Sequence, residues 1–77
     1  MYVERINLIC LLAGISQSRL AKELGISKQA LNNYVTGKRK FSNVVRIGIL
    51  KQFDLPSKVF EQHQLHLVLK GDKLIVL

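Results

Sequence analysis

The stretch from Ile15 to Lys40 constrains the fold more than any other part of the chain. Ser16 and Ser27 each precede a short segment with helical spacing of apolar residues, and serine is a favoured helix N-cap. Gly25 lies between the two segments, where a positive φ can end the first helix and turn the chain. Small Ala21 lies one turn earlier, where crossing helices approach closely. The stretch therefore predicts a helix-turn-helix.

The second predicted helix, from Lys28 to about Thr36, has two chemically different faces. One face is apolar, and the other carries amides, a hydroxyl and one cation but no acid, namely Lys28, Gln29, Asn32, Asn33 and Thr36. Amides of Gln and Asn can form paired hydrogen bonds with adenine, and Lys can donate to guanine. The outer face therefore indicates a helix that reads bases. The alternative is an ordinary amphipathic helix whose outer face lacks acid.

Positive charge is concentrated on this part of the chain, whose 77 residues have a formal net charge of +7. Positions 16 to 51 hold eight basic residues and one acid, Glu23, whereas the remainder holds four of each. The excess therefore lies on the predicted helix-turn-helix and the helix after it, as expected of a protein that binds a phosphate backbone. The competing interpretation is a basic helix on a membrane surface, but no basic segment has a wide apolar face.

A family resemblance rests on both predicted helices, their turn and the following loop: Gln17, Leu20, Ala21, Leu24, Gly25, Ile26, Leu31, Tyr34, Val35 and the TGKRK segment from Thr36 to Lys40. At this spacing these residues resemble the Cro and phage-repressor family of helix-turn-helix DNA-binding domains. The resemblance implies base contacts from Ser27, Lys28, Gln29, Asn32 and Asn33. It also implies phosphate contacts from Gln17 and from the loop after the second helix. We expect the phosphate contacts to come from Gln17, Arg19, Thr36, Lys38, Arg39 and Lys40. Phe41 follows this loop, where Pro is common in the family.

Three further helices are predicted around this stretch. An apolar run predicts a helix from about Val3 to Ala13. Ser42 can cap a helix from about Asn43 to Phe53, in which Gly48 indicates a close contact with another element. A short helix is expected from Ser57 to Phe60 or Glu61. The expected fold is therefore mainly α, with a five-helix, repressor-like helix-turn-helix domain.

Residues 62–77 differ in character from the helical domain, which we assign to residues 1–61. Two apolar runs, Leu65–Leu69 and Lys73–Leu77, flank a Lys-Gly-Asp turn and predict a β-hairpin. Both strand faces are largely apolar, and a hairpin alone is marginally stable, so other residues must cover it. We expect a second subunit to do so, as in strand-mediated dimers of the Cro group, through Leu67, Leu69, Leu74 and Val76. The alternative is a hairpin absorbed by its own domain.

Catalytic and metal-binding chemistry has little support in the sequence. Cys10 lies in an apolar run and is expected to be a buried hydrophobic residue. His63 and His66 lack the further ligands that a metal site needs. The five acids are scattered singly, and no nucleophile set or phosphate loop is present. We therefore expect no enzyme activity, metal, cofactor or small-molecule ligand.

These features together predict a sequence-specific regulator that binds double-stranded DNA as a homodimer, most simply a phage-type or mobile-element repressor. Half-sites about one helical turn apart would match such a dimer. No signal peptide is evident, so we expect a cytoplasmic, nucleoid-associated protein of a bacterium or phage-infected cell, with no membrane partner. Two alternatives stay open, namely a DNA-binding antitoxin whose hairpin holds a toxin, and a helix-turn-helix module that binds protein instead of DNA.

Overall fold

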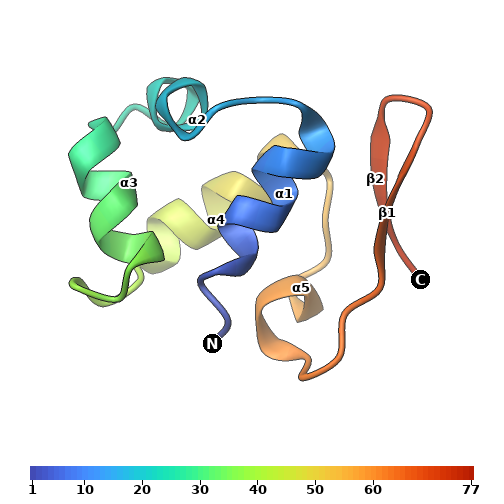
Figure 1. Ribbon diagram of the computed structural model, residues 1–77. Helices are drawn as coiled ribbons and strands as arrows, with labels where there is room; N and C mark the ends of the chain where they lie inside the picture. Colours follow the sequence, from blue (N-terminus) through green and yellow to red (C-terminus); the bar gives the residue numbers. More distant parts are fainter.

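In the computed structural model, residues 1–77 form five helices followed by a two-stranded antiparallel hairpin (Figure 1). The elements in chain order are α1 (Arg5–Ala13), α2 (Gln17–Leu24), α3 (Lys28–Val35), α4 (Asn43–Gln52), α5 (Lys58–Glu61), β1 (Leu67–Lys70) and β2 (Lys73–Val76). The predicted fold class is therefore confirmed. None of the five helices has the length and apolar content needed to cross a membrane.

Three helices begin where the sequence predicts because serine side chains cap them. The hydroxyls of Ser16 and Ser27 each accept a hydrogen bond from the backbone N–H three residues later, at 3.1 and 3.0 Å. Ser42 caps α4 in a similar way, with a 3.2 Å bond to the N–H two residues later. By contrast, α1 has no side-chain cap and begins at Arg5, later than the predicted Val3. Local hydrogen bonds of serine side chains therefore define where α2, α3 and α4 begin.

The core consists of buried residues that are all apolar and come from all five helices, the α4–α5 loop and β2: Ile6, Ile9, Cys10, Leu20, Ala21, Leu31, Val45, Ile49, Leu50, Leu55, Val59, Phe60 and Leu74. Gly48 lets α4 approach α2 closely, because a Cβ at this position would lie 3.1 Å from Leu24 Cδ2. The close contact predicted at Gly48 is therefore confirmed.

Arg5 ties the start of α1 to the end of α5. Its guanidinium donates hydrogen bonds to the backbone oxygens of Val59 and His63, both at 2.8 Å, and to that of Gln62. The last carbonyls of a helix have no partner within the helix, so the bond to Val59 stabilises the end of α5, and the other two bonds hold the residues that follow it. The same guanidinium lies 4.2 Å from the ring centroid of Tyr2. A cation near the N-terminus thus orders both ends of the helical domain.

The hairpin lies at the opposite end of the molecule from α3 and packs beside α1 (Figure 1). Leu67 pairs with Val76, and Leu69 pairs with Leu74, so these four side chains share one face of the two strands. Leu74 is buried in the core, and Leu67 and Val76 pack against it, whereas Leu69 is 48% exposed. This face is therefore largely covered by the helical part of the same chain.

The other face of the hairpin points away from the core. Val68 is 38% exposed and Leu77 is 75% exposed, and Ile75 pairs with Val68 on the same face. β1 begins at Leu67 and not at Leu65 as predicted, because Leu65 packs against the core without joining the ladder. The domain thus covers one apolar face of the hairpin and leaves the other exposed.

Candidate nucleic-acid interface

The turn between α2 and α3 holds the second helix against the first. Gly25 adopts φ +74°, in the left-handed region that favours glycine, and ends α2. The Ile26 N–H then donates to the Ala21 oxygen at 3.0 Å. Leu31 of α3 is fully buried, and Tyr34 and Val35 pack against the core. The opposite side of α3, with its polar stripe, is consequently turned outward.

The polar stripe of α3 combines exposed and partly covered side chains. Lys28 and Gln29 are exposed, whereas Asn32 and Asn33 are half-buried. Gln29 Nε2 donates a hydrogen bond to Asn33 Oδ1 at 3.0 Å, which links two predicted base-reading residues across one helical turn. Ser27 is exposed too, but its oxygen already accepts the capping bond of α3. The hydroxyl proton of Ser27 is left to donate to a ligand.

The loop after α3 brings its three cations beside the polar stripe. Lys38, Arg39 and Lys40 are exposed, and the Arg39 N–H donates to the Asn33 backbone oxygen at 3.1 Å. The Thr36 hydroxyl donates to the Asn32 backbone oxygen at 2.9 Å, so it is engaged in ending the helix. The predicted base-reading residues and the predicted phosphate-binding loop therefore lie next to one another.

Phe41 anchors this loop to the core. Its ring centroid lies 5.9 Å from that of Tyr34 and 5.3 Å from that of Phe60, the latter in an edge-on arrangement. The Arg39 guanidinium lies 5.9 Å from the Tyr34 ring centroid, on the solvent side of the same cluster. A proline at this position would fix the end of the loop by restricting φ. Phe41 fixes the end of the loop by packing its ring against Tyr34 and Phe60.

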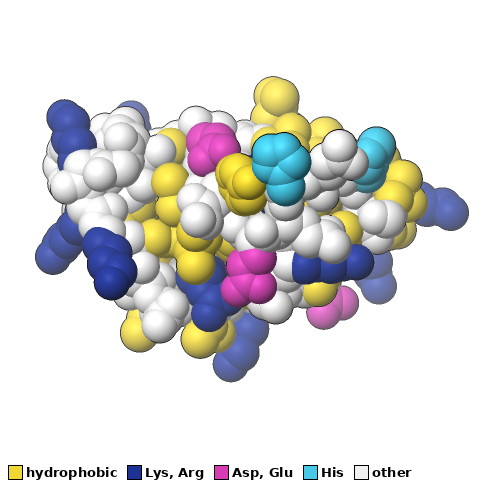
Figure 2. Space-filling model, turned by 90° about the horizontal axis from the view of Figure 1, so that it is seen from below, with side chains coloured by type: hydrophobic (Ala, Val, Ile, Leu, Met, Phe, Trp, Pro, Cys, Tyr) yellow, Lys and Arg dark blue, Asp and Glu magenta, His cyan; other side chains and the backbone are white.

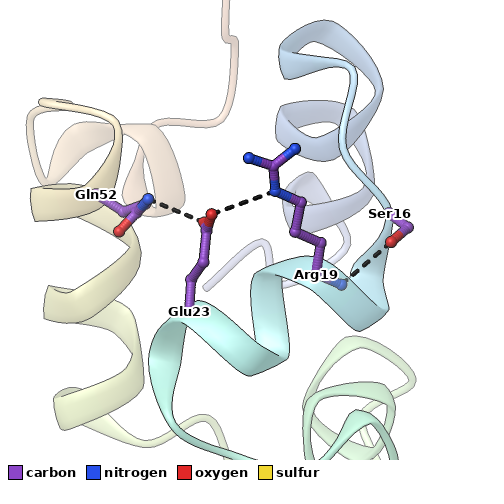
Figure 3. Close-up of polar contacts among 4 residues, drawn as sticks. All are labelled: Ser16, Arg19, Glu23 and Gln52. Carbon is purple, nitrogen blue, oxygen red and sulfur yellow. Dashed lines mark hydrogen bonds and ion pairs between the residues drawn. The ribbon is translucent and has the colours of Figure 1, made fainter.

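The start of α2 supplies the other predicted phosphate contacts. Gln17 Nε2 donates a hydrogen bond to Asn7 Oδ1 of α1, which holds the Gln17 amide at the first position of α2. Arg19 Nε lies 3.3 Å from Glu23 Oε1, and Gln52 Nε2 donates to Glu23 Oε2 at 2.9 Å (Figure 3). The only acid in this part of the chain is thus bound to its neighbours, although this ion pair also neutralises part of the Arg19 charge.

The charge distribution is one-sided. At the end of the molecule that holds α3 and the following loop, which is on the left in Figures 1 and 2, Lys and Arg are the only charged side chains in view (Figure 2). Cations crowded on one surface raise the local concentration of a polyanion and can exchange counterions with phosphates. This surface suits a nucleic-acid backbone.

The structure places the predicted dimerisation residues far from the basic surface, on the hairpin. Of the four, Leu69 alone is exposed, and Leu67, Leu74 and Val76 lie on the face that packs against the core of the same chain. Both hairpin faces are apolar in sequence, so residue type does not distinguish the inward face from the outward one. The exposed alternative is the face of Val68.

The structure also shows the surroundings of Cys10 and His63. Burial raises the pKa of the Cys10 thiol, which disfavours the reactive thiolate. His63 Nδ1 lies 2.8 Å from the Tyr2 hydroxyl oxygen. The structure has no group of three or more His, Cys, Asp or Glu side chains arranged to hold a metal ion.

Sequence reasoning missed two residues that support the interface. Asn7 lies on α1, and its bond to Gln17 crosses the α1–α2 turn, so no local pattern indicates it. Phe41 is visible only as a departure from proline, and its ring contacts form with residues distant in sequence. The Gln29–Asn33 bond is different, because its i,i+4 spacing on a helix could have predicted it.

Comparison with known proteins agrees with this geometry. A family model described as helix-turn-helix (HTH_3) matches residues 6–57, which is more than half of the chain and includes α2 to α4 and all of α1 except its first residue. Searches of curated proteins and of solved structures give no match. The matched segment contains the turn, α3 and the basic loop, and ends before the hairpin.

Proposed function

Because the chain belongs to the HTH_3 helix-turn-helix family of XRE and Cro type, whose members bind DNA, we propose that it is a sequence-specific transcriptional repressor. The proposal adds a dyad-symmetric operator and a homodimer to what the family implies. The observation that carries it is the stripe of Lys28, Gln29, Asn32 and Asn33 on α3, which contains no acid and lies beside the exposed cations of residues 38–40.

In the proposed complex, α3 enters the major groove and its amides contact base edges. Gln17, Arg19 and the loop cations contact phosphates on either side and position the helix, and the Thr36 hydroxyl joins them only by releasing the Asn32 oxygen. Occupation of an operator by such a complex would exclude RNA polymerase from an overlapping promoter, which is the simplest route to repression. The proposal assigns no catalytic step to any residue.

We propose that the homodimer forms through the outward face of the hairpin. Val68 and Leu77 are exposed on this face and Ile75 is half-buried, so together they offer an apolar surface. The hairpin and α3 lie at opposite ends of a molecule whose longest dimension is 30 Å. Two copies placed in line would span about twice that length, so half-sites about 34–36 Å apart require the copies to incline toward the DNA.

Selection from a random double-stranded DNA pool, followed by titration across salt, tests the DNA-binding part of the proposal. We expect an enriched palindrome. The slope of log affinity against log salt should be about −7 if four cations in each of two subunits contact phosphates, namely Arg19, Lys38, Arg39 and Lys40. It should be about −5 if Glu23 neutralises Arg19. Binding without enrichment would indicate a non-specific DNA-binding protein, and the repressor proposal would be abandoned.

Light scattering tests the dimer separately. Val68→Asp places a charge on the outward hairpin face, so we expect the mass to fall from that of a dimer to that of a monomer. Val44→Asp is the matched control, because Val44 is 80% exposed on α4 and the substitution changes the net charge equally. An equal mass for both variants and the unmodified protein would place the interface elsewhere.

A second candidate function is a DNA-binding antitoxin. A groove of about 920 Å³ runs along β2 from Lys73 to Val76, and the C-terminal end of α4 and residues 53–56 line its other side. The free edge of β2 could pair with an extended segment of another protein. Under this alternative, the protein purified from its own host would carry a second polypeptide in stoichiometric amount, and removal of that polypeptide would leave DNA binding intact.

A further inference from the structure

Gln29 and Asn33 form an amide pair on the outer side of α3. Gln29 is exposed and Asn33 is half-buried, and the 3.0 Å bond runs from Gln29 Nε2 to Asn33 Oδ1. This bond uses one N–H of the Gln29 amide. The other N–H and the carbonyl oxygen are free to bind DNA. A donor beside an acceptor is what adenine requires in the major groove, since adenine presents N7 as an acceptor and N6–H as a donor.

Asn33 is itself held in place. Its backbone oxygen accepts the Arg39 N–H at 3.1 Å, which ties this turn of α3 to the basic loop. Because Asn33 is partly covered and Gln29 is not, the two amides are suited to different tasks. The covered amide can act as a support, and the exposed one can reach the ligand.

We infer that Asn33 is a positioning residue that orients the Gln29 amide for adenine and against guanine. The inference rests on the proposed function, and it concerns which base the same site selects. A Gln amide without a partner can rotate by half a turn and present its NH₂ group to the two acceptors of guanine, N7 and O6. With its nitrogen held by Asn33, the amide presents its oxygen toward the position of guanine O6, where two acceptors repel each other.

The bond also changes what Asn33 can offer. One of the two lone pairs of its oxygen accepts the Gln29 N–H, and its NH₂ group is free to donate to DNA. This NH₂ group suits an acceptor such as thymine O4 or a phosphate oxygen. One adenine preference is therefore expected from this pair, and it belongs to the base that faces Gln29.

The test compares base preferences of the full-length protein and its variants, selected in parallel from one random double-stranded DNA pool. Gln29→Ala locates the base that faces Gln29, because preference at that position is lost. Asn33→Ala removes the acceptor, and we expect the ratio of adenine to guanine affinity at the same position to fall about two- to tenfold, the effect of releasing one ordered side chain. Asn33→Asp keeps the acceptor, so we expect adenine preference to persist while affinity for all DNA falls.

Two controls separate positioning from a general loss of structure. Asn32→Ala removes a neighbouring amide of the same stripe that makes no side-chain hydrogen bond to Gln29, and adenine preference at the Gln29 position should not change. In a Gln29→Ala background, Asn33→Ala should have no further effect at that position. Circular dichroism of each variant would confirm that α3 is folded.

The results distinguish failure of the inference from failure of the proposed function. If the unmodified protein enriches no sequence, the repressor proposal and this inference both fail. If it enriches a sequence but Asn33→Ala leaves the adenine-to-guanine ratio at the Gln29 position unchanged, or if that position does not select adenine, the positioning role of Asn33 is refuted and sequence-specific binding stands.

Discussion

Replacement of Phe41 by alanine is expected to lower the free energy of unfolding by about 2–3 kcal/mol. Two ring contacts are lost, to Tyr34 at 5.9 Å and to Phe60 at 5.3 Å, and aromatic pairs contribute about 0.5–1.5 kcal/mol each beyond their burial. Full truncation of a buried Phe costs about 3–5 kcal/mol, and Phe41 is half-buried, so the lower part of that range is the upper limit here.

Thermal unfolding followed by circular dichroism measures this effect. For a chain of this length, about 1 kcal/mol corresponds to roughly 4–8 °C, so we expect Tm to fall by about 10–20 °C. Phe41→Leu keeps most of the apolar volume but loses both ring pairs. We expect it to lower the free energy of unfolding by about 1 kcal/mol. The difference between the two variants isolates the packing contribution from the ring geometry.

The same variants test whether Phe41 positions the basic loop. At a temperature where Phe41→Ala is still folded, release of Lys38–Lys40 should weaken binding to random DNA, because ordered cations then become mobile. A Tm within about 4 °C of the unmodified protein would refute the packing argument. Unchanged affinity for random DNA in a destabilised variant would refute the link between packing and loop position.

Three further outcomes are expected. Asn7→Ala frees the Gln17 amide and should lower affinity for the selected operator and for random DNA by the same factor, about two- to tenfold in a binding titration; a loss confined to the operator would contradict the phosphate role of Gln17. Gly25→Ala should lower the unfolding free energy in urea by about 1–2 kcal/mol, because φ is +74° and no atom lies within 4 Å of the added Cβ, so backbone strain is the only cost; an unchanged midpoint would contradict this. Burial raises the pKa of Cys10, so its contribution to stability is intact below the ordinary thiol pKa of about 8.5 and is lost as pH rises through the raised value. Urea denaturation from neutral to alkaline pH should show a steeper loss of stability for the unmodified protein than for Cys10→Ala, and parallel curves would refute it.

The helix-turn-helix could be predicted because local interactions define it. Ser16 and Ser27 bond to backbone N–H groups three residues away, and Gly25 ends α2 through its own φ. Such contacts are complete within a few residues, so residue type and spacing are sufficient evidence for them. The polar stripe of α3 was predictable for the same reason, since its apolar stripe shows which side faces the core.

The hairpin could be predicted only in part from the sequence. Its two strands and turn follow from two apolar runs around Gly71, but the first strand begins two residues later than predicted because Leu65 packs against the helices. Both of its faces are apolar, so alternation could not indicate which one faces the core. Packing against α1 decided that Leu74 turns inward and Val68 outward, and the proposed dimer surface changed with it.

By itself, the sequence determined the helix-turn-helix, the basic surface and the residues that face outward on α3, because periodicity, capping and charge are properties of near neighbours. Only the tertiary structure decided how those residues are supported. Asn7 reaches Gln17 from another helix, Phe41 packs against Phe60, and Arg5 binds the end of α5. Each of these contacts joins segments whose approach depends on how the whole core packs, and no local pattern specifies that approach.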